Sequence, residues 1–263
     1  NPHKYGNKSI IDGLQYDGLT DVYCNEAMGV LGDKCADKYN FSREDQDNYA
    51  IESYKRSSNA WKEGKFNNEI VSVEINLRNS EKLEINQDEE YKNINFEKVP
   101  KLRPAFSKDG TVTAANASTI SDGAASLILM SKDKCSELNL TPIATIKYYC
   151  DAAQDPDWFT TAPSLAVKKI LSNNNLSIDD VDYFEFNEAF SVVALANMKI
   201  LGLKADKVNV NGGAVSLGHP LGCSGARILT TLSHILINNN AKRGIAAICN
   251  GGGGASAILI ERN

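Results

Sequence analysis

Apolar residues recur at helical spacing after Ser42. Serine is a favoured N-cap residue, and the acidic residues that follow it suit the first turn of a helix. The apolar positions beyond them lie three or four residues apart. This pattern predicts a helix over residues 42 to about 61 that ends near Gly64.

Two other stretches predict strands. Residues 69–77, EIVSVEINL, alternate between apolar and polar positions, and the short apolar run at residues 125–130 indicates a buried strand. Residues 78–100 are charged and rich in Asn, so we expect a solvated excursion there rather than core.

From Pro142 onward, strand-like and helix-like segments alternate. The predicted strands cover residues 144–153, 181–186 and two runs within 244–262, and the predicted helices cover about 164–172, 187–201 and 224–237. Such alternation is typical of a layered α/β fold with a largely buried sheet.

Composition places the chain among soluble globular proteins. Of its 263 residues, 42% are hydrophobic and 23% are charged, which excludes wholesale disorder. No apolar run approaches the roughly 20 residues that span a bilayer, and 28 Lys and Arg against 33 Asp and Glu give a net charge of −5. We therefore expect neither a membrane nor a nucleic acid as an obligatory partner.

The cysteines favour a reducing compartment. Six of them lie far apart without a C-x-x-C pair, which argues against a disulfide framework or a zinc site. The chain begins with Asn1 rather than Met, and its first residues do not look like the start of a domain, so we expect a segment in front of it.

Glycines mark the candidate chemistry. Ten of the 19 glycines fall between Gly212 and Gly254, in two segments that contain His219 and Cys249. Glycine lets the backbone approach a ligand and point N–H groups into a cavity, where they stabilise a developing oxyanion.

Each candidate also has a structural interpretation. Asn187, in the NEAF segment at a predicted strand-to-helix junction, could be a helix cap. His219 could be a turn residue before a proline, and Cys249 a buried residue at a strand end. His3 near the terminus and His234 in a predicted amphipathic helix are both interpreted as structural.

Nine segments, taken in order, resemble the thiolase family, most closely its acetyl-CoA C-acetyltransferase (acetoacetyl-CoA thiolase) branch. They are DGLTDVY (17–23), MG (28–29), SREDQDNYAIESY (42–54), GKFNNEIV (64–71), VPKLRPAF (99–106), GTVTAANASTISDGAA (110–125), NEAF (187–190), NGGAVSLGHPLGCSGARI (211–228) and CNGGGGASA (249–257).

The resemblance implies a thiolase-like layered α-β-α-β-α fold with two similar halves and an inserted loop domain. On that template, residues 1–112 are the loop domain and tether, 113–135 end the N-terminal half, and 136–263 are the complete C-terminal domain. The first half would be largely absent, so we expect this chain alone to be poorly stable, with one sheet face uncovered.

The resemblance also implies an activity: reversible Claisen condensation of two acetyl-CoA to acetoacetyl-CoA plus CoA, with thiolysis as the reverse. Cys249 matches the acid/base cysteine, and His219 matches the histidine that activates the nucleophile. Asn187 matches the residue that fixes an oxyanion-site water, and the N–H of Gly251 matches an oxyanion-hole donor. Coenzyme A is then a substrate, and no redox cofactor is implied.

Binding residues carry over in the same way. Ser118 matches a residue that bonds the pantetheine arm, and Lys98 is a candidate for the nucleotide phosphates. The apolar channel around the arm matches Leu19, Met28, Leu102, Phe106, Ala114, Ala117 and Phe190. A potassium site of some members matches Tyr54, Ala114, Ala115, Ala117 and Val215, although ordinary packing explains these residues nearly as well.

Two departures keep alternatives open. Short-chain members usually carry a His where this chain has Ala27, which bears on substrate preference. The nucleophilic cysteine would lie upstream, because neither Cys24 nor Cys35 has its sequence context, so we expect the chain as given to be inactive. The alternatives are a degradative 3-ketoacyl-CoA thiolase and a truncated, non-catalytic binding partner. Family members suggest a homo-oligomer (dimer or tetramer) and a role in lipid or ketone-body metabolism, with mitochondrion and cytoplasm both open.

Overall fold

The computed structural model describes residues 5–78 and 81–262. Its helices are α1 (Met28–Tyr39), α2 (Arg43–Lys62), α3 (Lys132–Glu137), α4 (Ala162–Asn173), α5 (Ser191–Leu201), α6 (Ala214–Leu217) and α7 (Ser224–Asn238). Its strands are β1 (Val73–Asn76), β2 (Lys82–Ile85), β3 (Thr145–Ala153), β4 (Tyr183–Phe186), β5 (Arg243–Asn250) and β6 (Gly254–Glu261). His3 lies outside the described residues.

The main sheet has the strand order β3-β6-β5-β4. Strands β3 and β6, and β6 and β5, pair antiparallel, whereas β5 and β4 pair parallel. A single parallel bridge from Phe184 to Val208 extends the sheet beyond β4. The parallel pair places the carboxyl ends of β4 and β5 at the same edge.

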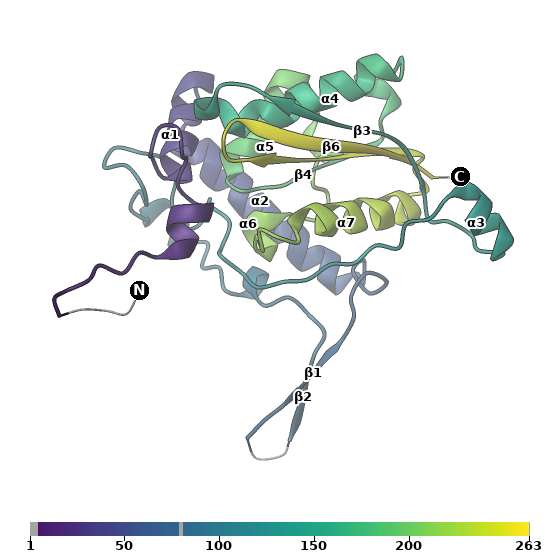
Figure 1. The fold of residues 1–263 in the computed structure, drawn as a ribbon, viewed down its shortest axis with the longest axis horizontal. Helices are drawn as coiled ribbons and strands as arrows, with labels where there is room; N and C mark the ends of the chain where they lie inside the picture. Colours follow the sequence, from purple (N-terminus) through teal and green to yellow (C-terminus); the bar gives the residue numbers. More distant parts are fainter. Residues whose placement is uncertain (1–4, 79–80, 263) are drawn as a thin grey trace.

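Helices cover both faces of this sheet, with α4 on one side and α7 on the other (Figure 1). The alternation of side chains along β5 explains why both faces are apolar: Ile245 packs in the cluster beneath α4, and Ala246 packs with Leu232 of α7. The α/β layering predicted from the alternating segments is therefore confirmed.

Helix α2 confirms the prediction around Ser42. The Ser42 hydroxyl accepts a hydrogen bond from the Asp45 N–H at 3.0 Å, and the Asp45 carboxylate accepts one from the Ser42 N–H at 2.8 Å. This capping box satisfies free N–H groups of the first turn. Gly64 follows the helix with a φ of +69°, a left-handed conformation that glycine adopts readily.

The predicted strand at residues 69–77 forms only in its second half, as β1. It pairs antiparallel with β2, and this hairpin extends away from the main sheet (Figure 1). The first part of the predicted solvated excursion is mostly exposed, and it contains a second strand that we did not predict. The rest is not solvated throughout, because Tyr91 stacks on Trp61 of α2 and Val99 is buried. Within the excursion, residues 79–80 lie outside the described residues.

The prediction of a buried strand at residues 125–130 is wrong. The run has no regular secondary structure, and the side chains of Ile128 and Leu129 are 86% and 70% exposed. An apolar run becomes a buried strand only when neighbouring strands pair with it, and in the described part of the chain no strand does so.

No helix among the described residues is both long and apolar enough to cross a bilayer. All six cysteines are free thiols, and Cys35 and Cys135 are buried. The division of the chain at residues 112 and 135 stays a prediction.

Candidate functional site

The site lies where β4 and β5 end side by side. Asn187 directly follows β4, and its N–H donates to the Ala247 carbonyl of β5 at 3.0 Å. Cys249 lies two residues beyond Ala247 on the same strand. Asn187 and Cys249, which are 62 positions apart in the sequence, thus reach the same edge of the sheet. Carboxyl ends of parallel strands are common positions for ligand sites in α/β folds.

His219 joins Asn187 directly. Its Nε2 lies 3.1 Å from the Asn187 Nδ2, and its backbone N–H donates to the Thr119 carbonyl at 3.1 Å. Since an amide nitrogen only donates, Nε2 must offer its lone pair to Asn187. The predicted pairing of Asn187 and His219 in one site therefore occurs in the structure.

Ser224 determines the form of this histidine. The Ser224 hydroxyl lies 2.6 Å from His219 Nδ1 and donates to the Pro220 carbonyl at 3.0 Å. Its single proton is thereby used, so it accepts from Nδ1–H. The neutral tautomer carries its proton on Nδ1, so the basic lone pair of the ring is on Nε2, where it accepts from Asn187.

His219 is neutral at physiological pH. Burial and, to a smaller extent, the nearby positive charge of Arg227 together lower its pKa to about 4. The imidazole can therefore accept a proton, and the imidazolium that results is a strong enough acid to release it again.

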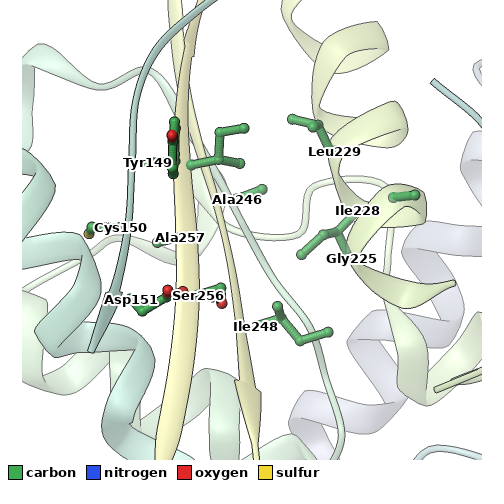
Figure 2. A pocket seen from close by; sticks show the side chains of 12 residues that line it. Tyr149, Cys150, Asp151, Gly225, Ile228, Leu229, Ala246, Ile248, Ser256 and Ala257 are labelled. Carbon is green, nitrogen blue, oxygen red and sulfur yellow. Dashed lines mark hydrogen bonds between the residues drawn. The ribbon is translucent and has the colours of Figure 1, made fainter. Parts of the chain in front are cut away.

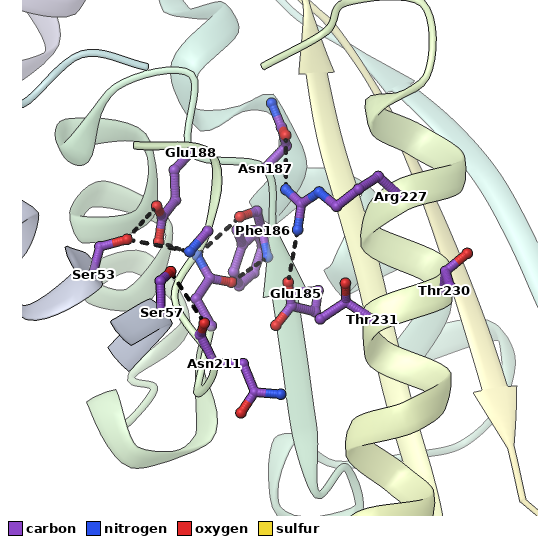
Figure 3. A network of polar contacts seen from close by, with 12 residues as sticks. Ser53, Ser57, Glu185, Phe186, Asn187, Glu188, Asn211, Arg227, Thr230 and Thr231 are labelled. Carbon is purple, nitrogen blue, oxygen red and sulfur yellow. Dashed lines mark hydrogen bonds and ion pairs between the residues drawn. The ribbon is translucent and has the colours of Figure 1, made fainter. Parts of the chain in front are cut away.

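The buried carboxylate of Glu188 connects the site to its surroundings (Figure 3). One oxygen accepts from the Tyr49 hydroxyl and from Asn209 Nδ2, both at 2.8 Å. The other accepts from the Ser53 hydroxyl at 2.8 Å and the Val215 N–H at 3.1 Å. These bonds join α2, the start of α5 and the loop before His219, and sequence reasoning did not identify them.

Cys249 is followed by a tight glycine turn between β5 and β6. Gly252 and Gly253 have φ values of +80° and +84°, which few other residues tolerate. Burial raises the pKa of the Cys249 thiol to about 12, so the group is protonated at neutral pH. The site thus combines a neutral imidazole with a protonated thiol at the start of a glycine turn.

The turn is in contact with the N-terminal part of the chain. The buried Asp21 carboxylate accepts from the Gly252 N–H at 3.1 Å. A side chain at Gly251 would overlap the Met28 methyl group, and the Met28 N–H donates to the Leu19 carbonyl at 2.9 Å. Leu19 and Met28, two predicted channel residues, therefore lie beside the predicted oxyanion-hole donor Gly251.

Other predicted channel residues pack in the same region. Met28, Ala117, Phe190 and Cys249 belong to one apolar cluster. The Phe106 and Phe190 rings meet edge to face with centroids 6.0 Å apart. Phe106 is exposed by 43%, which places it at the outer rim of this cluster.

Ser118 lies against the start of α5. Both its N–H and its hydroxyl donate to the Ala189 carbonyl, at 3.0 and 2.9 Å. Lys98 and Ala114 are exposed, and Leu102 borders a surface hollow. The predicted roles of Ser118, Lys98, Leu102 and Ala114 in binding coenzyme A stay predictions.

The five residues of the predicted potassium site are only partly brought together. Tyr54 and Val215 share a small buried cluster, and the Tyr54 hydroxyl donates to Glu90 at 3.3 Å. Ala115 and Ala117 are buried, whereas Ala114 is exposed. Packing accounts for Tyr54 and Val215, and the ion site stays a prediction.

A separate hollow of about 380 Å³ lies between α7 and strands β3, β5 and β6 (Figure 2). Its lining is mostly apolar and includes Tyr149, Leu229, Ile248 and Ile258. None of the predicted catalytic residues lines it.

Sequence reasoning missed Ser224, Arg227 and Glu185, which all lie close to the Asn187–His219 pair. Ser224 and Arg227 belong to the glycine-rich segment of residues 211–228, and Glu185 interrupts an apolar strand. The sequence did contain one indication, because a carboxylate such as Glu185 within an otherwise apolar strand is typical of a functional position.

Comparisons with known proteins identify the family. A model of the thiolase N-terminal domain matches residues 1–133, and a model of the thiolase C-terminal domain matches residues 140–262. A probable acetyl-CoA acetyltransferase of Dictyostelium discoideum is 55% identical, over 98% of this chain and 63% of its own length. A cytosolic acetyl-CoA acetyltransferase of Gibberella zeae is 52% identical, over 99% and 66%. The chain thus spans about two thirds of the length of these relatives.

A solved structure has the same fold. The Acat5 thiolase from Ascaris suum in complex with coenzyme A is 47% identical and has a TM-score of 0.90. The similarity covers 100% of this chain and 67% of that chain. The thiolase-like fold expected from the nine segments is confirmed.

Proposed function

Because this chain belongs to the thiolase family, we propose that the protein is a thiolase-type acyltransferase that interconverts two acetyl-CoA with acetoacetyl-CoA and CoA. Family membership rests on the two domain models and on relatives named acetyl-CoA acetyltransferase. Acetyl-CoA is then the substrate, and His219 and Cys249 are the acid/base groups that this chain contributes.

The observation that carries the proposal is the Asn187–His219 pair. Ser224 leaves His219 Nε2 as the basic nitrogen, and Nε2 lies 3.1 Å from the amide nitrogen of Asn187. Thioester chemistry needs a base and a hydrogen-bond donor close together. A thiol must lose its proton to the base while a carbonyl oxygen gains negative charge that the donor stabilises.

In the first half-reaction, His219 Nε2 takes the proton of the nucleophilic cysteine thiol. We expect that cysteine to lie upstream of residue 1. The thiolate attacks the acetyl-CoA carbonyl carbon, the bond from that carbon to the CoA sulfur breaks, and the imidazolium returns its proton to the CoA thiolate. Asn187 supports the oxyanion. The products are an acetyl-cysteine and free CoA.

In the second half-reaction, Cys249 moves the proton at the methyl carbon of acetyl-CoA. For condensation, its thiolate takes that proton, and the enolate carbon attacks the acetyl-cysteine carbonyl carbon. The bond from that carbon to the cysteine sulfur breaks, which releases acetoacetyl-CoA and leaves the nucleophilic cysteine as a thiolate and Cys249 as a thiol. For thiolysis, the Cys249 thiol protonates the departing enolate. The raised pKa of Cys249 favours the thiol form and hence the proton-donating role in thiolysis.

The test is an assay of CoA-dependent cleavage of acetoacetyl-CoA by the protein isolated from its natural source, together with its intact mass. We expect activity that is lost in His219→Ala and Cys249→Ser variants. An inactive natural protein with a mass of 28.6 kDa would overturn the proposal and favour a non-catalytic binding partner.

Three finer parts of the proposal have their own tests. Competition between acetoacetyl-CoA and longer 3-ketoacyl-CoA substrates distinguishes the short-chain enzyme from a degradative thiolase. The question arises because Ala27 stands where short-chain members usually carry a His. Activity in potassium compared with sodium tests the site at Tyr54 and Val215. Sedimentation tests the dimer or tetramer, and cell fractionation distinguishes cytoplasm from mitochondrion.

A further inference from the structure

Arg227 is a partly buried cation that the proposed mechanism does not use. It lies in the first turn of α7, and its side chain is 19% exposed. We propose that Arg227 is the positioning residue of the Asn187–His219 pair, because its guanidinium contacts the Asn187 side-chain oxygen and fixes which end of the amide faces His219. This inference rests on the proposed function of the pair.

The geometry of the amide supports this role. Arg227 Nη2 lies 3.5 Å from Asn187 Oδ1 (Figure 3). Asn187 Nδ2 lies 3.1 Å from His219 Nε2. With the oxygen directed at a permanent cation, the amide nitrogen must face the histidine. The reversed amide would place its N–H groups against the guanidinium and its oxygen against the Nε2 lone pair, and both contacts are repulsive.

Glu185 orients Arg227 from the other side. This residue of β4 is 1% exposed, and neither of its carboxylate oxygens has a hydrogen-bond partner among the described residues. Arg227 Nη1 lies 3.7 Å from Glu185 Oε2. Burial raises the pKa of Glu185 well above its usual range, and Arg227 counteracts that increase. The Arg227 guanidinium therefore lies between Glu185 and Asn187, with one nitrogen directed at each.

Two more carboxylates face Arg227 from the segment that contains the β1–β2 hairpin. Burial raises the pKa of Glu69 to about 7 and raises that of Asp88, while Arg227 lowers both. Glu69 also accepts a hydrogen bond from Thr231, one turn along α7 from Arg227, at 3.4 Å. Arg227 therefore interacts electrostatically with this segment and contacts Asn187 of the catalytic pair, while it belongs to α7 itself.

The consequence for His219 is electrostatic as well as geometric. Burial is the larger cause of the lowered pKa of His219, and the Arg227 charge adds to it. Loss of the charge should therefore raise the pKa of His219, whereas loss of a merely structural contact should not.

The test uses NMR titration of His219 in the full chain, with the resonance assigned by its absence in His219→Asn. Arg227→Gln is combined with Glu185→Gln, so that Glu185 does not remain buried without the neighbouring cation, and circular dichroism checks that the double variant folds although Glu69 and Asp88 also lose that cation. We expect the pKa of His219 to rise above about 4 in this double variant and to stay below the ordinary 6.5, because burial remains. Glu185→Gln alone retains the cation, so we expect no rise.

Arg243→Gln is the matched control, because Arg243 is 25% exposed and pairs with Glu261 at 2.7 Å away from the site. We expect this variant to leave the titration unchanged. A folded double variant with an unchanged His219 titration would overturn the electrostatic part of the proposal.

Arg227→Lys separates charge from geometry. Lysine retains the charge but lacks the planar fork, so we expect the His219 titration to persist while kcat for acetoacetyl-CoA cleavage falls about tenfold at an unchanged KM. An unchanged kcat would overturn the positioning role. Absence of cleavage in the unsubstituted protein would instead contradict the proposed function, and the titration would still test the contact.

Discussion

The Ser224 hydroxyl lies 2.6 Å from Nδ1 of His219 while donating its own proton to the Pro220 carbonyl. The Pro220 carbonyl thus orients the Ser224 hydroxyl so that Nδ1 carries the proton and Nε2 is the basic nitrogen of His219. Ser224 is the first residue of α7, so the helix start and the tautomer of His219 are determined together. This relationship leads to the first prediction.

We expect Ser224→Ala to lower kcat/KM for acetoacetyl-CoA cleavage between about tenfold and a hundredfold, because Nδ1–H loses its acceptor and the base is no longer fixed at Nε2. Nitrogen-15 chemical shifts of the His219 ring measure the tautomer directly, and they should change in the variant.

Ser233→Ala is the matched control for that experiment. Ser233 lies on the same helix, and its hydroxyl donates to the carbonyl four residues earlier, Leu229, at 2.8 Å, as Ser224 does to Pro220. We expect it to leave activity and ring shifts unchanged. Identical ring shifts in Ser224→Ala and the unsubstituted protein would contradict the role assigned to Ser224.

Local signals were sufficient to predict some elements. The capping box at Ser42 and Asp45 lies within four residues, and the helix formed as expected. The prediction of a buried strand at residues 125–130 was wrong because burial of Ile128 and Leu129 depends on neighbouring strands rather than on the apolar run itself. Composition within a short run cannot supply those neighbours.

The candidate site shows the same division. Glycine density indicated His219 and Cys249, and the family resemblance added Asn187 and the channel residues. Glu185, Arg227 and Ser224 were missed because their importance depends on distances across the fold. Arg227 meets Asn187, 40 positions away, only after α7 packs against β4.

Asp21 should contribute stability that disappears on acidification. Burial alone would raise its pKa, but the N–H groups of Cys24, Tyr23 and Gly252 donate to the carboxylate and lower the pKa below 3.8. A carboxylate whose pKa is lower when folded stabilises the protein above the unfolded value, and this contribution is lost as the pH falls below about 4.

We therefore expect Asp21→Asn to lower the free energy of unfolding at pH 7 by about 1–3 kcal/mol and to flatten its dependence on pH between about 2 and 5. Urea unfolding at several pH values measures both. The control is Asp37→Asn on α1, where the side chain is exposed. Equal slopes against pH in Asp21→Asn and the unsubstituted protein would contradict the prediction.

Glu188→Gln should be strongly destabilising, since an amide NH₂ would replace one oxygen that now accepts two hydrogen bonds in a buried site. We expect a loss of roughly 3 kcal/mol in the free energy of unfolding, measured by urea unfolding. Glu44→Gln, at an exposed position of α2, is the control and should change stability by less than about 0.5 kcal/mol. A loss as small as that of the control would mean that the Glu188 carboxylate does not connect these elements.

Cys249 should resist alkylation at neutral pH, because only the thiolate reacts and burial raises the thiol pKa to about 12. We expect iodoacetamide labelling of Cys249 in the folded protein to remain slow at pH 8 and to accelerate as the pH approaches 11. Mass spectrometry of the digested protein gives the rate for each cysteine separately. The same chain unfolded in urea is the control, since there Cys249 should label like any exposed thiol. Rapid labelling of folded Cys249 at pH 8 would show that the thiolate already forms at rest, and Cys249 would then begin the cycle as the base for condensation rather than as the proton donor for thiolysis.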